Sequence, residues 1–184
     1  MIKLRSYADK DYKDRTWNQA VKLVGQKQAA IHILGDFAKG ELTAMGLKAG
    51  EDFFCSLAPG ANDNMIYAID IFLMLKVDEP YLKEGQQILF DSIFDPAVQA
   101  DYNSRKGSMP IRYDVDLQKL DICSRERYKQ WIDPKQKIVR FSGIEHPLRT
   151  SVLQSTMQQA WTENMTPQQL TDLLLEMDSL ANGK

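Results

Sequence analysis

The chain has 184 residues, of which 43% are hydrophobic, and its 23 basic and 25 acidic side chains give a formal net charge of −2. A chain of this size can bury a core, so we expect a single domain over residues 1–184. The charge balance excludes the basic surface that nucleic acid requires, and no apolar run is long enough to span a bilayer. The first residues lack the apolar core of a secretory signal, which indicates either a cytoplasmic protein or an N-terminus further upstream.

Local patterns predict a few strands among many helices. Three apolar runs predict strands, over residues 29–34, 53–58 and 65–75. Helices are expected over residues 17–24, 37–45, 80–94, 96–106 and 117–131, and two more follow a short extended segment at 138–142. Gly25 is expected just after the first of these helices, Asp36 is placed to cap the second, and Thr166 caps the last. The pattern predicts an α/β fold with a small sheet of about three strands wrapped by many helices.

The cysteines and histidines give no sign of a metal site. Cys55 and Cys123 lie far apart without metal-ligand spacing, and buried free thiols are the favoured interpretation. A disulfide in an oxidising compartment is the alternative. The two histidines, His32 and His146, are too few to predict a zinc site, and His32 alternates with apolar neighbours as a structural residue would. We therefore expect no metal and no cofactor.

Two breaks between predicted elements carry side chains that suit a polar ligand. At Gly35 the backbone can bend or let a ligand come close, Asp36 offers two acceptor oxygens, and Phe37 offers a flat apolar face. Together they suit a sugar ring, although a plain strand-to-helix turn is the alternative. In the segment over residues 106–112, lysine, serine and arginine side chains can donate hydrogen bonds to hydroxyl groups. A solvated helix end with Lys106 near the negative end of the helix dipole is the alternative there.

Two further polar residues have structural interpretations that compete with a ligand role. His146, in a break at residues 143–146, either donates to a ligand or is an ordinary loop histidine. Asp70 stands in an apolar run and, if buried, needs a partner, so a structural bond to a basic side chain or to backbone amides is favoured.

Catalysis is not indicated. The sequence holds no nucleophile motif, and nothing in it places Asp36 opposite Glu145 as a pair of glycosidase carboxylates. We therefore expect a protein that is not an enzyme and has no catalytic residues, with a small glycosidase as the third hypothesis for its function.

The order of several short motifs resembles the C-terminal lobe of family 1 extracellular solute-binding proteins, the periplasmic glucose- and mannose-type proteins of ABC sugar importers. The matching residues are Trp17, Gly25, Ala29-Ala30, Gly35-Asp36-Phe37, Ala38-Lys39-Gly40, Pro59-Gly60, Asp70-x-Phe72, Gln99, Lys106-Gly107-Ser108-Met109-Pro110-Ile111-Arg112, Trp131 and Ile138-Val139. Phe37 stands where the family usually has tryptophan, which points to a different sugar or to a role in helix packing.

The resemblance implies a lobe of the type II periplasmic-binding-protein fold, with a sheet of about three to five strands. It implies a carbohydrate-binding subunit in the periplasm that binds a mono- or oligosaccharide, with ABC transporter permease subunits as partners. Gly35, Asp36 and Lys106 are the sugar-contacting residues it implies, with Phe37 and His146 at the same site.

Members of the family have two lobes that close on the sugar, so we expect an N-terminal lobe and a signal peptide to be missing from this chain. The apolar face left bare would favour a homodimer. A free-standing protein-interaction module without transport function is the alternative.

Overall fold

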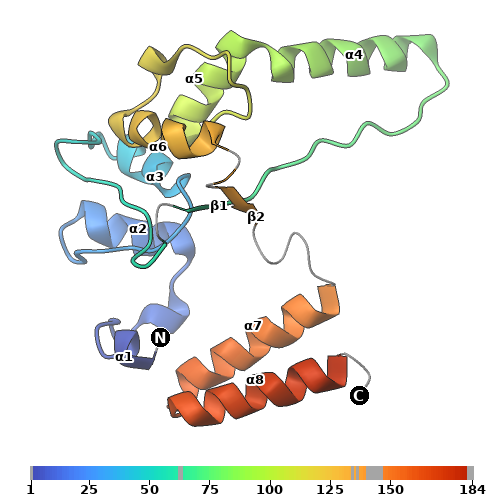
Figure 1. The fold of residues 1–184 in the computed structure, drawn as a ribbon. Coiled ribbons are helices and arrows are strands. Elements are labelled where there is room, and N and C mark those ends of the chain that lie inside the picture. Colours follow the sequence, from blue (N-terminus) through green and yellow to red (C-terminus); the bar gives the residue numbers. More distant parts are fainter. Residues whose placement is uncertain (1, 62–63, 134, 136, 140–146, 182–184) are drawn as a thin grey trace. The chain divides into compact units, whose positions relative to one another are not determined.

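The computed structural model describes residues 2–61, 64–133, 135, 137–139 and 147–181 (Figure 1). The chain divides into two compact units: a central unit over residues 15–138, and a terminal unit formed by residues 1–14 together with residues 139–184. In the part of the chain that the structure describes, no helix is both long and apolar enough to cross a membrane.

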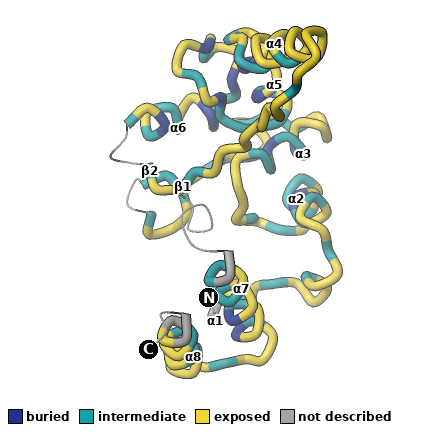
Figure 2. Tube along the Cα trace, turned by 90° about the vertical axis from the view of Figure 1, so that its right-hand side faces the viewer, coloured by how far each residue is buried: buried dark blue, intermediate teal, exposed yellow. Residues whose placement is uncertain are grey.

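Most of the central unit is helical. Its elements, in chain order, are α2 (Trp17–Gly25), α3 (Ala38–Ala44), β1 (Met65–Tyr67), α4 (Pro80–Phe94), α5 (Pro96–Lys106), the 3₁₀ turn η2 (Leu117–Lys119), α6 (Ile122–Ile132) and β2 (Lys137–Val139), whose last residue is grouped with the terminal unit. β1 and β2 form a two-stranded sheet. Buried residues lie mainly in the other helices, whereas α4 has none (Figure 2).

The helix ends follow from local chemistry. The Asp95 carboxylate accepts hydrogen bonds from the amides of Ala97 and Val98 and so begins α5, and Gly107, with φ +85°, ends it in the left-handed conformation that favours glycine. The predicted helix over 117–131 instead starts as a 3₁₀ turn, and α6 begins only after Asp121, whose side chain accepts from the Ser124 amide at 2.9 Å.

Two predicted helix-end roles are wrong. The N-cap residue of α3 is Phe37 rather than Asp36, and no side chain caps this helix. Gly25 is the last residue of α2 rather than the residue after it. A Cβ at Gly25 would lie 2.8 Å from Met45 Cε, so this glycine lets the Met45 side chain approach the end of α2.

The core of the central unit surrounds a disulfide. The buried residues Val21, Leu42, Phe53 and Cys123 pack together, with Cys55 partly buried against them. Cys55 and Cys123, 68 positions apart, are bonded with their Cα atoms 5.6 Å apart. The favoured prediction of free thiols is therefore wrong, because the tertiary fold brings together two cysteines whose spacing carries no signal.

The α/β class is confirmed, but the sheet in the described residues is smaller than expected. Residues 29–34 and 53–58 form no strand, apart from an isolated bridge between Ala49 and Phe53, and β1 covers only the start of the 65–75 run. A strand needs a neighbour for its backbone groups. The apolar sequence favours a strand, but no described element supplies that neighbour.

The terminal unit joins both ends of the chain. Its elements are α1 (Ile2–Arg5), the 3₁₀ turn η1 (Tyr12–Asp14), α7 (Pro147–Thr162) and α8 (Pro167–Ala181). The Tyr12 and Trp161 rings meet edge to face at 5.9 Å, and Arg5 Nη1 donates to Asn164 Oδ1 at 3.3 Å. At the start of α8, the Thr166 hydroxyl accepts a hydrogen bond from the Gln169 amide, and the Gln169 side chain accepts one from the Thr166 amide. This pair of bonds confirms Thr166 as the predicted cap.

Candidate functional site

Two glycines bring the beginning of α3 against the end of α5. A Cβ at Gly40 would lie 2.6 Å from the Lys106 carbonyl oxygen, and a Cβ at Gly107 would lie 2.5 Å from the Gly40 nitrogen. Both distances are too short for any side chain because the opposing atoms are backbone. We call this approach the glycine contact. It places the turn at Asp36 beside the segment that starts at Lys106.

The Asp36 side chain completes this junction. Its Oδ2 accepts a hydrogen bond from the backbone N–H of Met109 at 2.8 Å, although the two residues are 73 positions apart. The structure therefore brings together the two segments that the sequence analysis selected separately. The carboxylate bonds an amide across this junction and does not cap its own helix.

Asp36 has an unusual electrostatic setting. Surrounding protein atoms displace water from the carboxyl group and raise its pKa above the ordinary value, although the residue as a whole keeps exposed surface. The Met109 amide and the charges of Lys39 and Lys106 act in the opposite direction. Because Asp36 is an exposed residue, its carboxylate stays open to a hydrogen-bond donor from solution.

Lys106 turns its ammonium group toward Asp70. The Lys106 Nζ donates to Asp70 Oδ2 at 2.7 Å, and this bond is the main cause of a raised pKa for Lys106. The side chain of Asp70 is 82% exposed. A bond to backbone amides or to a basic side chain is the prediction for a buried Asp70; the bond to a basic side chain is present, but the carboxylate lies at the surface. We call Asp36, Asp70 and Lys106 the acid–lysine cluster.

The other sequence-predicted residues differ in placement. The Phe37 ring packs edge to face on Trp17 at 5.2 Å and lies over Gly35, where a Cβ would be 2.7 Å from the ring. It therefore has a packing role at the beginning of α3. Arg112 is bonded to Asp114, its Nε donating to Oδ1 at 2.7 Å. His146, together with Glu145, lies outside the described residues.

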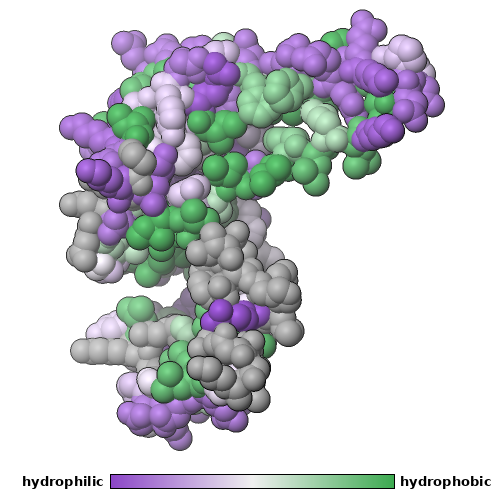
Figure 3. Space-filling model, turned by 45° about the vertical axis from the view of Figure 1, so that its right-hand side comes forward, coloured by the Kyte–Doolittle hydropathy of each residue, from purple (hydrophilic) through white to green (hydrophobic). Residues whose placement is uncertain are grey.

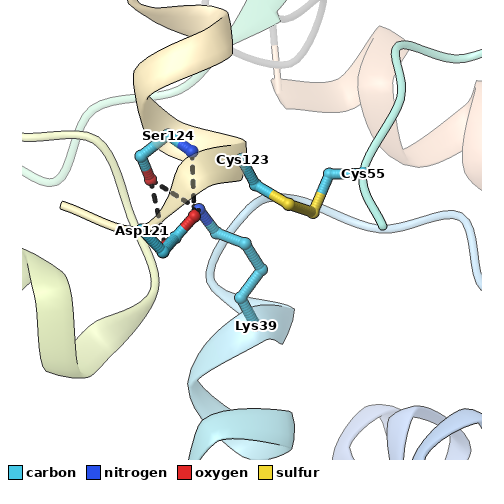
Figure 4. Close-up of a disulfide and its surroundings, with 5 residues drawn as sticks. All are labelled: Lys39, Cys55, Asp121, Cys123 and Ser124. Atoms are coloured by element: carbon cyan, nitrogen blue, oxygen red, sulfur yellow. Dashed lines mark hydrogen bonds and ion pairs between the residues drawn. A yellow bond between two sulfur atoms is a disulfide. The ribbon is translucent and has the colours of Figure 1, made fainter. Parts of the chain in front are cut away.

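A buried lysine that the sequence analysis used only as part of a motif holds the site in place. Lys39, 6% exposed, bonds Asp121 Oδ2 at 2.9 Å and the Ser124 hydroxyl at 2.5 Å (Figure 4). Because Asp121 and Ser124 lie at the start of α6, this network fixes α3 to α6. Figure 4 shows it beside the Cys55–Cys123 disulfide, so two cross-links hold the start of α6, one to α3 and one to the loop at Cys55.

Asp70 and Lys39 were the site residues that sequence reasoning undervalued. Asp70 carried a signal, since it is the only charged residue in the run over residues 65–75. Lys39 carried no signal beyond its place in the Ala38-Lys39-Gly40 motif, because its partners come from a distant helix. Among the described residues, no group of histidine, cysteine and acidic side chains is arranged to hold a metal ion.

Comparison with known proteins places this arrangement in context. No family model matches the chain. A probable sugar-binding periplasmic protein of Brucella suis is 38% identical over 146 residues, which are 79% of this chain and 34% of that protein. A protein of the same description from Rhizobium meliloti is 34% identical over 146 residues, 79% of this chain and 35% of that protein. The chain is a homologue of periplasmic solute-binding proteins.

The likeness also reaches a distant relative. An uncharacterised ABC transporter extracellular-binding protein of Pyrococcus horikoshii is 25% identical over 139 residues, 75% of this chain and 30% of that protein. These relatives are named as binding proteins rather than enzymes. The resemblance seen in the sequence motifs is thus confirmed, and this solute-binding-protein homologue spans about a third of the length of the curated relatives it matches.

Proposed function

We propose that this chain forms one wall of the sugar site in a periplasmic solute-binding protein of an ABC importer, as the C-terminal lobe of that protein. The observation that carries the proposal is the acid–lysine cluster. Asp36, from the turn before α3, and Lys106, from the end of α5, are joined through the glycine contact, and Lys106 in turn holds Asp70. The names of the relatives support a sugar as the ligand.

The chemistry of the cluster suits neighbouring hydroxyl groups. Each carboxylate accepts hydrogen bonds from hydroxyls, and the ammonium group donates to hydroxyl or ring oxygens. The Asp36 carboxylate accepts from the Met109 amide and also interacts with the Phe37 amide, and its two oxygens can together accept further hydrogen bonds from a sugar. Lys106 has three donors, of which Asp70 occupies one. Gly35 and Phe37 would flank the ligand, and His146 would add a donor. We infer binding of a mono- or oligosaccharide without a cofactor and without bond cleavage.

The compartment and partners follow from the same proposal. A disulfide between Cys55 and Cys123 suits an oxidising compartment, and the relatives in Brucella and Rhizobium are named as periplasmic. We therefore infer a periplasmic protein that delivers sugar to the permease subunits of an ABC transporter. The name of the Pyrococcus relative supports a transporter of this class.

Calorimetry on a chimera tests the proposal. In this chimera, the aligned residues of this chain replace the 146-residue matching segment of the Brucella suis protein, so that any second wall of the site is present. We expect saturable heat on titration with glucose, mannose or a related sugar. Because a buried hydrogen bond to a charged group contributes roughly 1.5–3 kcal/mol, Asp36→Asn and Lys106→Met should each weaken binding by about 10- to 100-fold.

Matched variants control for loss of charge alone. Asp101→Asn and Lys48→Met remove exposed charges outside the cluster, at side chains 62% and 71% exposed, and should leave the affinity unchanged. A folded chimera that binds none of a panel of sugars would refute the proposal. Hydrolysis of aryl glycosides that is lost in Asp36→Asn would instead identify a glycosidase.

A further inference from the structure

Lys39 is a charged residue in a place that normally holds an apolar one. It lies in the first turn of α3 and shares a buried face of this helix with Leu42, one turn later. Figure 3 shows hydrophilic side chains along the upper edge of the central unit, and such a surface is the usual place for a lysine. A cation that is withdrawn from water destabilises a fold unless it is paired, so the partners of Lys39 decide what it can do.

The Lys39 ammonium group is bonded at the start of α6. Its Nζ donates to both carboxylate oxygens of Asp121, at 3.1 and 2.9 Å, and to the Ser124 hydroxyl. An anchor between two helices does not need a charge, because well-packed apolar residues in place of a buried ion pair are often as stabilising as the pair or more so. The ion pair therefore points to a role for the charge beyond anchoring.

The backbone of Lys39 adjoins the turn at Asp36. Its N–H donates to the Asp36 carbonyl oxygen at 3.0 Å. A Cβ at Gly107 would lie 3.1 Å from Lys39 Cβ and 3.2 Å from that carbonyl oxygen, so both residues pack on the glycine contact. A shift of Lys39 would therefore move the turn whose carboxylate bonds the Met109 amide.

The charge of Lys39 also acts on the Asp36 carboxyl group. Burial raises the pKa of Asp36, whereas hydrogen bonds from the amides of Met109 and Phe37 lower it. The ammonium groups of Lys39, from α3, and Lys106, from the end of α5, lower it as well. Two lysines thus favour the form of Asp36 that accepts hydrogen bonds.

The two lysines differ in how far their charges are screened. Lys106 shares its ammonium group with Asp70, whose side chain is 82% exposed, so water and salt screen that charge. Lys39 is held away from water, where screening is weaker. Of the pair formed by Lys39 and Asp121, it is the ammonium charge that acts on Asp36.

We propose that Lys39 is a positioning residue of the site: it anchors the turn at Asp36 to α6 and supplies a fixed positive charge that keeps the Asp36 carboxylate available to accept hydrogen bonds. Lys39 acts through Asp36 and does not itself touch the ligand. The inference rests on the proposed function for the identity of that ligand, but the state of Asp36 can be measured without a sugar.

Titration of the Asp36 carboxyl group in the full chain, followed by carbon NMR without sugar, tests this inference. Two variants break the same ion pair: Lys39→Met removes the positive charge, whereas Asp121→Asn keeps it. We expect a higher titration midpoint for Asp36 in Lys39→Met and no rise in Asp121→Asn. Lys48→Met, which removes an exposed ammonium group elsewhere, should leave the midpoint unchanged.

A double variant keeps the test decisive if Lys39→Met alone does not fold. Removal of one partner leaves a buried charge unpaired, whereas Lys39→Met/Asp121→Asn removes both charges. Its midpoint should still be higher than that of the wild type, because only the ammonium charge of this pair acts on Asp36. An unchanged midpoint in the folded double variant overturns the inference. So does an equal rise in Lys39→Met and Asp121→Asn, which a purely structural anchor would produce.

The sugar affinity of the chimera at a series of pH values separates this inference from the proposed function. In the unmodified chimera, the affinity should fall as Asp36 becomes protonated, and with Lys39→Met this fall should begin at a higher pH. The same pH dependence in both would overturn the inference and leave the proposed function intact. A chimera that binds no sugar would refute the proposed function, and with it the ligand role of Lys39.

Discussion

Asp36 shows most clearly how a residue's setting changes its chemistry. Burial raises its pKa, so the folded protein takes up a proton at this site at a higher pH than the unfolded chain does. The resulting stabilisation is fully present below the unfolded-state pKa and is lost as the pH rises through the folded-state pKa. In urea unfolding between about pH 3 and 7, the free energy of unfolding of the wild type minus that of Asp36→Asn should therefore fall with rising pH.

Asp114 is the matched control for this measurement. The hydrogen bond from the Arg112 side chain lowers the pKa of Asp114. The free energy of unfolding of the wild type minus that of Asp114→Asn should therefore rise with pH through the acidic range. A rise with pH in the free energy of unfolding of the wild type minus that of Asp36→Asn would contradict our expectation. It would mean that the Met109 amide and the nearby lysines lower the pKa of Asp36 by more than burial raises it.

Gly40 and Gly107 limit what the site can tolerate. An alanine at Gly107 should cost about 1–2 kcal/mol for its left-handed conformation alone, and more for its clash with the Gly40 nitrogen. Gly40→Ala should also destabilise the fold through the Lys106 carbonyl. Gly85→Ala in α4, where nothing lies within 4 Å of the added Cβ, should instead stabilise by about 0.5–1 kcal/mol. Thermal unfolding of the three variants measures these effects, and a neutral Gly107→Ala would contradict the glycine contact.

Individual site residues were predictable only where a motif carried them. Asp36 and Lys106 could be selected from the sequence because each stands at a break that resembles a family pattern. The Met109 amide, Asp70 and Lys39 acquire their roles from partners 36 to 85 positions away, which no local pattern encodes.

At the scale of elements, helix bounds were predicted from the sequence more accurately than strands were. The bounds of α4 and α5 were predicted because Pro80, Asp95 and Gly107 act within one turn of the helix ends. The run over residues 29–34 has the same strand propensity as a paired strand, but a strand also depends on a neighbour elsewhere in the fold. The absence of a strand over this run is therefore a tertiary property.

The disulfide is the strongest single constraint between elements. It ties the loop at Cys55 to the first turn of α6 and closes a loop of 68 positions, for which chain entropy predicts about 4 kcal/mol of stabilisation. The variant with both cysteines replaced by alanine should unfold at a markedly lower urea concentration than the oxidised wild type. Addition of dithiothreitol should lower the wild-type midpoint without affecting the variant. Equal midpoints for oxidised and reduced wild type would contradict the stabilising role.

At the scale of the whole molecule, the two units differ in how their chain is organised. The central unit is one continuous stretch that contains both cysteines and the residues packed around them. The terminal unit needs both chain ends, since Tyr12 packs on Trp161 and Arg5 bonds Asn164. A single domain was expected because a chain of this size and hydrophobic content can bury one core, and that expectation remains a prediction.

A fragment of residues 15–138 tests whether the central unit folds independently. Because its core and its disulfide are internal, we expect cooperative unfolding and slow amide exchange in α2, α3 and α6, as in the full chain. Removal of residues 1–14 alone should leave that protection intact while exchange in α7 accelerates, because the contacts from Tyr12 and Arg5 are lost. Loss of protection in α2, α3 and α6 of the fragment would show that the central unit depends on the chain ends, and the acid–lysine cluster with it.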